Sequence, residues 1–278
     1  EGAYQHALNY AKDRVQGAPL GQVEAKTIIH HGDVRRMLMH MKAMTEAARA
    51  VNYNAASSLD RGEQGDEAAH KRLEFLTPIA KAWATEVAQE VTGLGVQIHG
   101  GMGFVEETGA AQFVRDARII TIYEGTTGIQ GLDLIGRKIL RDGGAQLMSV
   151  MAEVEATVKQ LQTESNSLPQ LTAELTTALD QWQKASLDIT GRVMDDVDLV
   201  GACSVNYLML CGTVLGGWLM AKSALVAMEK TSEDPDFYGA KIITAEFYAA
   251  HILPRAGAYA TAATADSQLT MGLKEEQF

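Results

Sequence analysis

The chain has 278 residues with a net charge of −11, and it is 46% hydrophobic and 21% charged. This composition is typical of a soluble globular protein with one large domain or two ordinary ones, and it excludes a disordered chain. The acidic balance argues against a nucleic-acid surface, because binding to phosphate backbones requires clustered lysine and arginine. The first residues are Glu-Gly-Ala-Tyr rather than Met, so we expect the sequence to begin inside a longer protein.

Apolar residues recur with a 3.6-residue period along nearly the whole chain, with almost no alternation of period two, so we predict an all-α fold. The pattern predicts a first helix over residues 3–13. A second helix begins with Asp33 as its N-cap and ends before Arg61. A third helix starts around Pro78, because proline is tolerated in a first turn. A fourth helix carries residues 113–117.

A glycine pair marks the predicted domain boundary. The last helix of the first block, 129–141, is closed by Gly143-Gly144. We therefore predict an up-down helical bundle over residues 1–144, followed by a second helical domain over residues 145–278.

The second domain is predicted to contain amphipathic helices at 146–164 and 168–196, separated by a Ser-Asn-Ser-Leu-Pro break, and a closing hairpin at 238–265. The uncharged run 199–221 is long enough to span a membrane. It also contains polar residues and several glycines, and acidic residues crowd its start. We therefore expect a buried central helix and no membrane association.

Two cysteines, Cys203 and Cys211, lie within this apolar run. On one helix they are about 12 Å apart, too far for a disulfide. We interpret them as buried free thiols in a protein of a reducing compartment. We expect this compartment to be a bacterial cytosol, and the alternative is a mitochondrial matrix. No metal site is expected, because the adjacent His30 and His31 would diverge by about 100° on a helix.

The most informative stretch is 97–130, QIHGGMGFVEETGAAQFVRDARIITIYEGTTGIQ. Its glycine cluster either permits the close approach of a phosphate or simply ends a helix. Glu124 follows a short apolar run and precedes a Gly-Thr turn. Such a carboxylate is either partly desolvated, as suits a general base, or a helix N-terminal carboxylate stabilised by the dipole.

The motifs QIHGGMGF, RDARI and IYEGTTGIQ, in this order, resemble the C-terminal signature of FAD-dependent acyl-CoA dehydrogenases, as does the opening ALNYAKDRVQG. The resemblance covers roughly residues 1–141. Residues 146–278 resemble the extra helical domain of long members, including long-chain acyl-CoA and 3-methylmercaptopropionyl-CoA dehydrogenases. The resemblance implies that Glu124 removes the α proton of an acyl-CoA thioester while FAD takes the β hydride, which leaves a trans-2-enoyl-CoA.

The resemblance also implies a set of binding residues. The matching FAD contacts are Arg14, Gln97, Gly100, Gly101 and Thr126. The matching substrate contacts are Gly125, Tyr123 and Arg137. Several of these residues have a structural alternative: a helix-end cation for Arg14, a capping residue for Thr126 and Arg137, and a core aromatic for Tyr123. Gly128 and the pair His31-Gly32 depart from the family pattern, where polar side chains are common.

In this family, the segment that matches Gln97 to Gly101 approaches the FAD of a neighbouring subunit, which implies a homodimer or a dimer of dimers. An electron-transfer flavoprotein is the implied electron acceptor. The family's N-terminal and β domains are absent from this sequence, so we expect the chain alone to bind FAD poorly and to be inactive. The alternative function is a helical oligomerisation or interaction module without catalysis. The intact IYEGT motif favours the enzyme.

Overall fold

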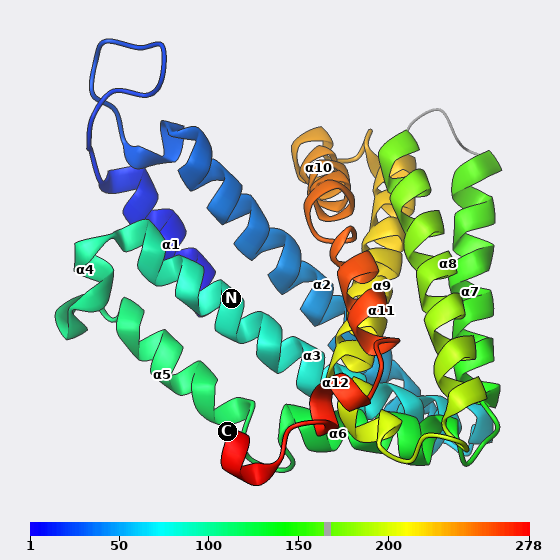
Figure 1. Ribbon diagram of the computed structural model, residues 1–278. Helices are drawn as coiled ribbons and strands as arrows, with labels where there is room; N and C mark the ends of the chain where they lie inside the picture. Colours follow the sequence, from blue (N-terminus) through cyan, green and yellow to red (C-terminus); the bar gives the residue numbers. More distant parts are fainter. Residues whose placement is uncertain (164–167) are drawn as a thin grey trace. The chain divides into compact units, whose positions relative to one another are not determined.

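The computed structural model describes residues 1–163 and 168–278, and it is helical throughout apart from loops (Figure 1). These residues contain no β-strand, only an isolated bridge between Val15 and Thr27. The all-α prediction is therefore confirmed. The predicted break after the helix at 146–164 falls largely on residues 164–167, outside the described residues.

Contacts divide the chain into two compact units. The first unit consists of Glu1–Glu46 and Thr85–Glu124, and the second of Ala47–Ala84 and Gly125–Phe278. Two long helices contribute to both units. The predicted division at residues 144 and 145 follows the sequence rather than these contacts, and it stays a prediction.

The first unit is built around small residues that let helices approach closely. Its elements are α1 (Gly2–Asp13), η1 (Ile28–His30), the first part of α2 (Gly32–Glu63), the last part of α3 (Glu67–His99), α4 (Gly101–Phe104), η2 (Glu106–Thr108) and α5 (Ala110–Ile120). On α1 the buried face consists of alanines at four-residue spacing, Ala3, Ala7 and Ala11. A Cβ added to Gly95 of α3 would lie 3.8 Å from the Ala3 Cβ, so both helices present small residues at this contact.

The two long helices begin at residues other than those predicted. Asp33 is not the N-cap of α2, which starts at Gly32, and its carboxylate pairs instead with Arg36 within the first turn, at 2.8 Å. The third helix does not begin near Pro78, because α3 starts at Glu67 and contains Pro78 in its interior. Its start is capped by Asp66, whose Oδ1 accepts a hydrogen bond from the Ala69 amide at 3.0 Å.

The second unit contains the other helices. They are α6 (Thr127–Asp133), α7 (Ala145–Thr163), α8 (Pro169–Arg192), α9 (Leu199–Lys230), α10 (Pro235–His251), α11 (Arg255–Ala263), α12 (Gln268–Met271) and η4 (Glu275–Gln277). Between α6 and α7 the chain continues as a π-helical segment, η3 (Leu134–Ile139), where the pattern predicted one regular helix.

Helix α9 is the centre of this unit and contacts α6, α7, α8, α10 and α11 (Figure 1). Its glycines allow the close contacts, since a Cβ on Gly212 would lie 2.1 Å from the Trp83 Cγ and one on Gly216 2.5 Å from the Tyr248 hydroxyl. Among the described helices, α9 alone is long and apolar enough to cross a membrane, and 67% of its apolar window is buried within the protein. This burial agrees with the predicted core helix.

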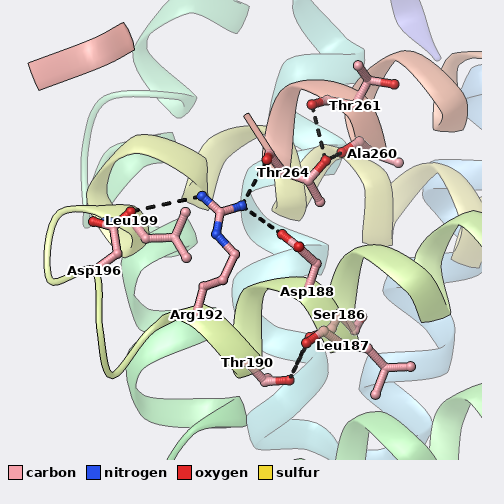
Figure 2. A network of polar contacts seen from close by, with 10 residues as sticks. All are labelled: Ser186, Leu187, Asp188, Thr190, Arg192, Asp196, Leu199, Ala260, Thr261 and Thr264. Carbon is pink, nitrogen blue, oxygen red and sulfur yellow. Dashed lines mark hydrogen bonds and ion pairs between the residues drawn. The ribbon is translucent and has the colours of Figure 1, made fainter. Parts of the chain in front are cut away.

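One arginine connects the ends of three helices of the second unit (Figure 2). Arg192, at the end of α8, donates to the Asp188 carboxylate at 2.8 Å and to the Thr264 carbonyl at 2.9 Å. Asp196, 4.0 Å from the same guanidinium, accepts from the amide of Leu199 at the start of α9. The arginine therefore supplies a hydrogen bond to the C-terminal end of α11, where backbone carbonyls lack helical partners.

Both cysteines of α9 are free and buried, as predicted. Burial raises the pKa of the Cys203 thiol to about 11, and it raises the pKa of Cys211 further. Both thiols are therefore protonated at neutral pH, which makes them poor nucleophiles.

Candidate active site

The segment that carries Glu124 is a short turn between α5 and α6. Thr121, directly after α5, is buried, and its hydroxyl donates to the Arg118 carbonyl at 3.1 Å. The same hydroxyl accepts from the Arg118 guanidinium, also at 3.1 Å. The Tyr123 amide donates to the Ile119 carbonyl at 3.2 Å. The end of α5 is therefore well anchored up to the residue before Glu124.

Glu124 has a left-handed backbone, with φ of 52°, and it is the single non-glycine residue with positive φ among those described. Gly125 follows with φ of 87°. Left-handed backbone costs an L-residue roughly 1–2 kcal/mol. Residues held in such conformations cluster at active sites, so this outlier supports a functional role for the turn.

Two contacts hold the other side of the turn. The Thr126 hydroxyl accepts a hydrogen bond from the Ile129 amide at 3.3 Å and so caps α6. Capping is the structural alternative that the sequence offered for this residue. Capping uses a lone pair of the hydroxyl oxygen, which can still donate its proton to a ligand. The Lys81 ammonium of α3 donates to the Gly125 carbonyl at 2.6 Å. Lys81 was missed by the sequence analysis, because no motif connects it to a turn so distant in sequence.

The surface of the turn is open. The Glu124 side chain is exposed, which does not favour the partly desolvated carboxylate, one of the two readings of this residue. Tyr123 is 51% exposed and is therefore not a core aromatic. Ile119 and Ile122 beside it are also exposed, at 55% and 46%. Apolar side chains gathered at an open surface mark a place where a ligand or another part of a protein binds.

A second turn lies at the end of α3, where Gly100 has φ of 60°. Gln97, Gly100 and Gly101 are exposed, and a Cβ added to either glycine would meet nothing within 4 Å. By contrast, a Cβ on Gly103 would lie 2.4 Å from the Val96 carbonyl oxygen. Gly103 is therefore required for packing, whereas the other two glycines leave open space where a ligand can approach the backbone.

Aromatic rings from α1 pack behind this second turn. The His99 Nδ1–H donates to the Gly95 carbonyl at 2.7 Å, and its ring stacks on Tyr10 at 4.3 Å and on His6 at 4.7 Å between centroids. The His6 ring in turn donates to the Thr108 carbonyl at 2.8 Å. Burial lowers the pKa of His99. His99 lies within the QIHGG motif, but nothing local in the sequence predicts its stacking on two rings of α1.

Comparison with known families decides the identity of the fold. A family model described as acyl-CoA dehydrogenase, C-terminal domain, matches residues 1–140, half of the chain. The chain belongs to the acyl-CoA dehydrogenase family. A further model, described as acetyl-CoA dehydrogenase C-terminal like, matches residues 150–274.

Known members of the acyl-CoA dehydrogenase family match nearly the whole chain. A 3-methylmercaptopropionyl-CoA dehydrogenase of Ruegeria pomeroyi is 43% identical over 98% of this chain and 48% of its own length. The broad-specificity linear acyl-CoA dehydrogenase FadE5 of Mycobacterium tuberculosis is 36% identical over 90% of this chain and 44% of its own length. The chain thus spans about half the length of these relatives.

A solved structure shares the fold. The acyl-CoA dehydrogenase of Bacillus anthracis, solved in complex with FAD, aligns over 99% of this chain and 47% of its own, with a TM-score of 0.74 and 18% identity. At this identity the likeness concerns the fold alone.

The residues that family membership suggests for FAD fit a flavin cofactor in part. The exposed amide of Gln97 and the open backbone at Gly100 and Gly101 suit a polar, phosphate-bearing ligand. Arg14 is exposed directly after α1, and its carbonyl accepts from the Ile28 amide at 2.7 Å. Its side chain is accessible for a charge-assisted contact with a phosphate.

Arg137 lies within the π-helical segment η3, where it forms an ion pair with Asp133 at 3.1 Å. It lies in the last turn of this segment, where a cation can act as a helix-end cap. It also borders a cavity of about 350 Å³ beside Lys71, Lys138 and Asp142. Its predicted contact with the substrate stays a prediction, as do the roles of the other residues carried over from the family.

Proposed function

We propose that this chain is the C-terminal part of a flavoprotein that oxidises acyl-CoA thioesters to trans-2-enoyl-CoA, with Glu124 as the catalytic base. The observation that carries the proposal is the strained backbone of Glu124 within an open turn, in a chain that belongs to the acyl-CoA dehydrogenase family. Strain of this kind persists where the surrounding structure holds it, and it orients a functional group in advance of the reaction.

The chemistry divides between the chain and its cofactor. The Glu124 carboxylate accepts the α proton, and the backbone N–H of the same residue donates to the thioester oxygen, where negative charge develops. The electron pair of the broken α C–H bond forms the new double bond as a hydride leaves the β carbon. FAD, when bound, would supply the acceptor for this hydride, so the redox chemistry would belong to the cofactor.

FAD would be held by Arg14 and Thr126 together with the exposed turn formed by Gln97, Gly100 and Gly101. That turn would serve the flavin of a second subunit, so the complete site requires a homodimer or a dimer of dimers. An electron-transfer flavoprotein would reoxidise the flavin. The buried free thiols suit a reducing compartment, and a bacterial cytosol would be one.

On its own, the 278-residue chain is expected to bind FAD poorly and to be inactive, because the Glu124 side chain and its apolar neighbours are exposed. A carboxylate in water is a weak base for an acidic C–H bond, and desolvation by other parts of a longer protein would strengthen it. Purified chain that is yellow and oxidises acyl-CoA would contradict this expectation.

The test of the proposed function uses the full-length protein that contains this chain, as wild type and as Glu124→Gln. Each is mixed anaerobically with acyl-CoAs of several lengths, and bleaching of the flavin is followed. We expect bleaching in the wild type and none in the variant, with FAD bound in both. Glu107→Gln, which removes another exposed carboxylate of the first unit, is the matched control and should bleach normally.

Two outcomes oppose the proposal. If Glu124→Gln bleaches as fast as the wild type, the base lies elsewhere. If the wild type binds FAD but none of the acyl-CoAs bleaches its flavin, the alternative function, a helical interaction module, is favoured instead.

A further inference from the structure

A lysine from a distant part of the chain holds the turn after Glu124. The Lys81 Nζ lies 2.6 Å from the Gly125 carbonyl oxygen, and the two residues are 44 positions apart in sequence. Lys81 is half-buried, and its neighbours on α3, Ala82 and Trp83, are 0% and 1% exposed. The backbone that carries the ammonium is therefore anchored in the core of the second unit.

The turn is strained and needs such a contact. Glu124 and Gly125 are consecutive residues with φ of 52° and 87°, and rotation at either one would move the Glu124 carboxylate. Strained backbone persists where the surrounding structure determines it from several sides. A bond from an ammonium to a carbonyl is charge-assisted and stronger than one between neutral groups. Lys81 therefore opposes the relaxation of this turn.

We propose that Lys81 is a positioning residue for the catalytic base. Its hydrogen bond holds the Gly125 carbonyl on the C-terminal side of the turn, and so opposes rotation at Gly125 and Glu124 that would turn the Glu124 carboxylate away from the substrate. This inference rests on the function proposed above, in which Glu124 removes the α proton. Loss of the Lys81 ammonium would slow proton abstraction, because displacing a base by about 1 Å can lower the rate 100-fold. Groups that bind the rest of the acyl-CoA would be unaffected.

The experiment measures the rate of flavin reduction per bound FAD in the full-length protein. Lys81→Met, which removes every donor, is expected to lower kcat by about 10- to 100-fold with little change in KM. The isotope effect with α-deuterated acyl-CoA should rise, because proton abstraction becomes the slower step. Lys81→Arg, which retains a charged donor, should recover part of the rate. Lys184→Met, which changes an exposed lysine of α8, is the control.

A reduction rate per flavin in Lys81→Met equal to that of the wild type would overturn the inference, even if the variant melts at a lower temperature. Should Lys81→Met not fold, Lys81→Gln and Lys81→Arg still decide, since the inference requires the charged donor to be faster. A normal rate in Lys81→Met beside an inactive Glu124→Gln would reject only the role of Lys81. A normal rate in Glu124→Gln would reject the proposed function itself.

Discussion

Replacing Glu124 by glycine should make the protein more stable than replacing it by alanine. Both changes remove the carboxylate, so they differ only in backbone preference. Alanine at φ of 52° bears the left-handed cost of roughly 1–2 kcal/mol. Glycine avoids that cost but loses about 0.5–1 kcal/mol through its more flexible unfolded state. The net expectation is that the glycine variant is more stable by roughly 0.5–1 kcal/mol.

The assay is urea unfolding of both variants, followed by circular dichroism. The same pair at Glu155, an exposed residue in the middle of α7, is the control, where alanine should be more stable by about 1 kcal/mol. The difference in unfolding free energy between the glycine and the alanine variant should therefore have opposite signs at the two positions. If alanine is the more stable residue at both, the turn is not strained in solution and the reasoning fails. In the full-length protein both Glu124 variants should be inactive, because both lack the carboxylate.

Three further outcomes are expected. Gly212→Ala should destabilise the chain by about 1–3 kcal/mol in urea, because the new methyl group meets the Trp83 ring, and a neutral result would contradict the packing. The lowered pKa of His99 means that the folded state favours its neutral form, so stability should be full above pH 6.5 and fall as the pH drops below that value. Hydrogen exchange of residues 100–109 measures this loss, and His99→Phe should remove it. Cys203 and Cys211 should resist alkylation at neutral pH until the protein unfolds.

The sequence predicted those helices whose position depends on the local pattern of apolar residues. The helix at 3–13, the helix around 113–117 and the buried apolar helix all depend on periodicity, and all are present. The predicted helix start at Pro78 was wrong because tertiary packing overrides the preference of proline for the first turn of a helix. An interior proline costs about 3 kcal/mol, but Phe75, Ile79 and Trp83 beside it are each at most 1% exposed. Burying each such side chain contributes roughly 1.5–3 kcal/mol, which outweighs that cost.

In the candidate site, too, local sequence predicts some features, whereas others depend on the tertiary structure. Its motifs could be recognised, yet nothing local predicts positive φ at a glutamate, since residues other than glycine rarely adopt it. The contact of Lys81 with Gly125 depends on the path of α3, and hence on the missed start of that helix at Glu67. Long-range contacts of this kind require the tertiary structure.

The helix that follows the turn packs against the central helix of the second unit. Helix α6 begins directly after Thr126, and a Cβ on its Gly131 would lie 2.9 Å from the backbone of Ser204 in α9. Helix α6 therefore packs backbone to backbone against the central helix, which α8, α10 and α11 surround. The division between the compact units falls between Glu124 and Gly125. Within the second unit, the segment that follows the turn is thus joined through α6 to the central helix α9.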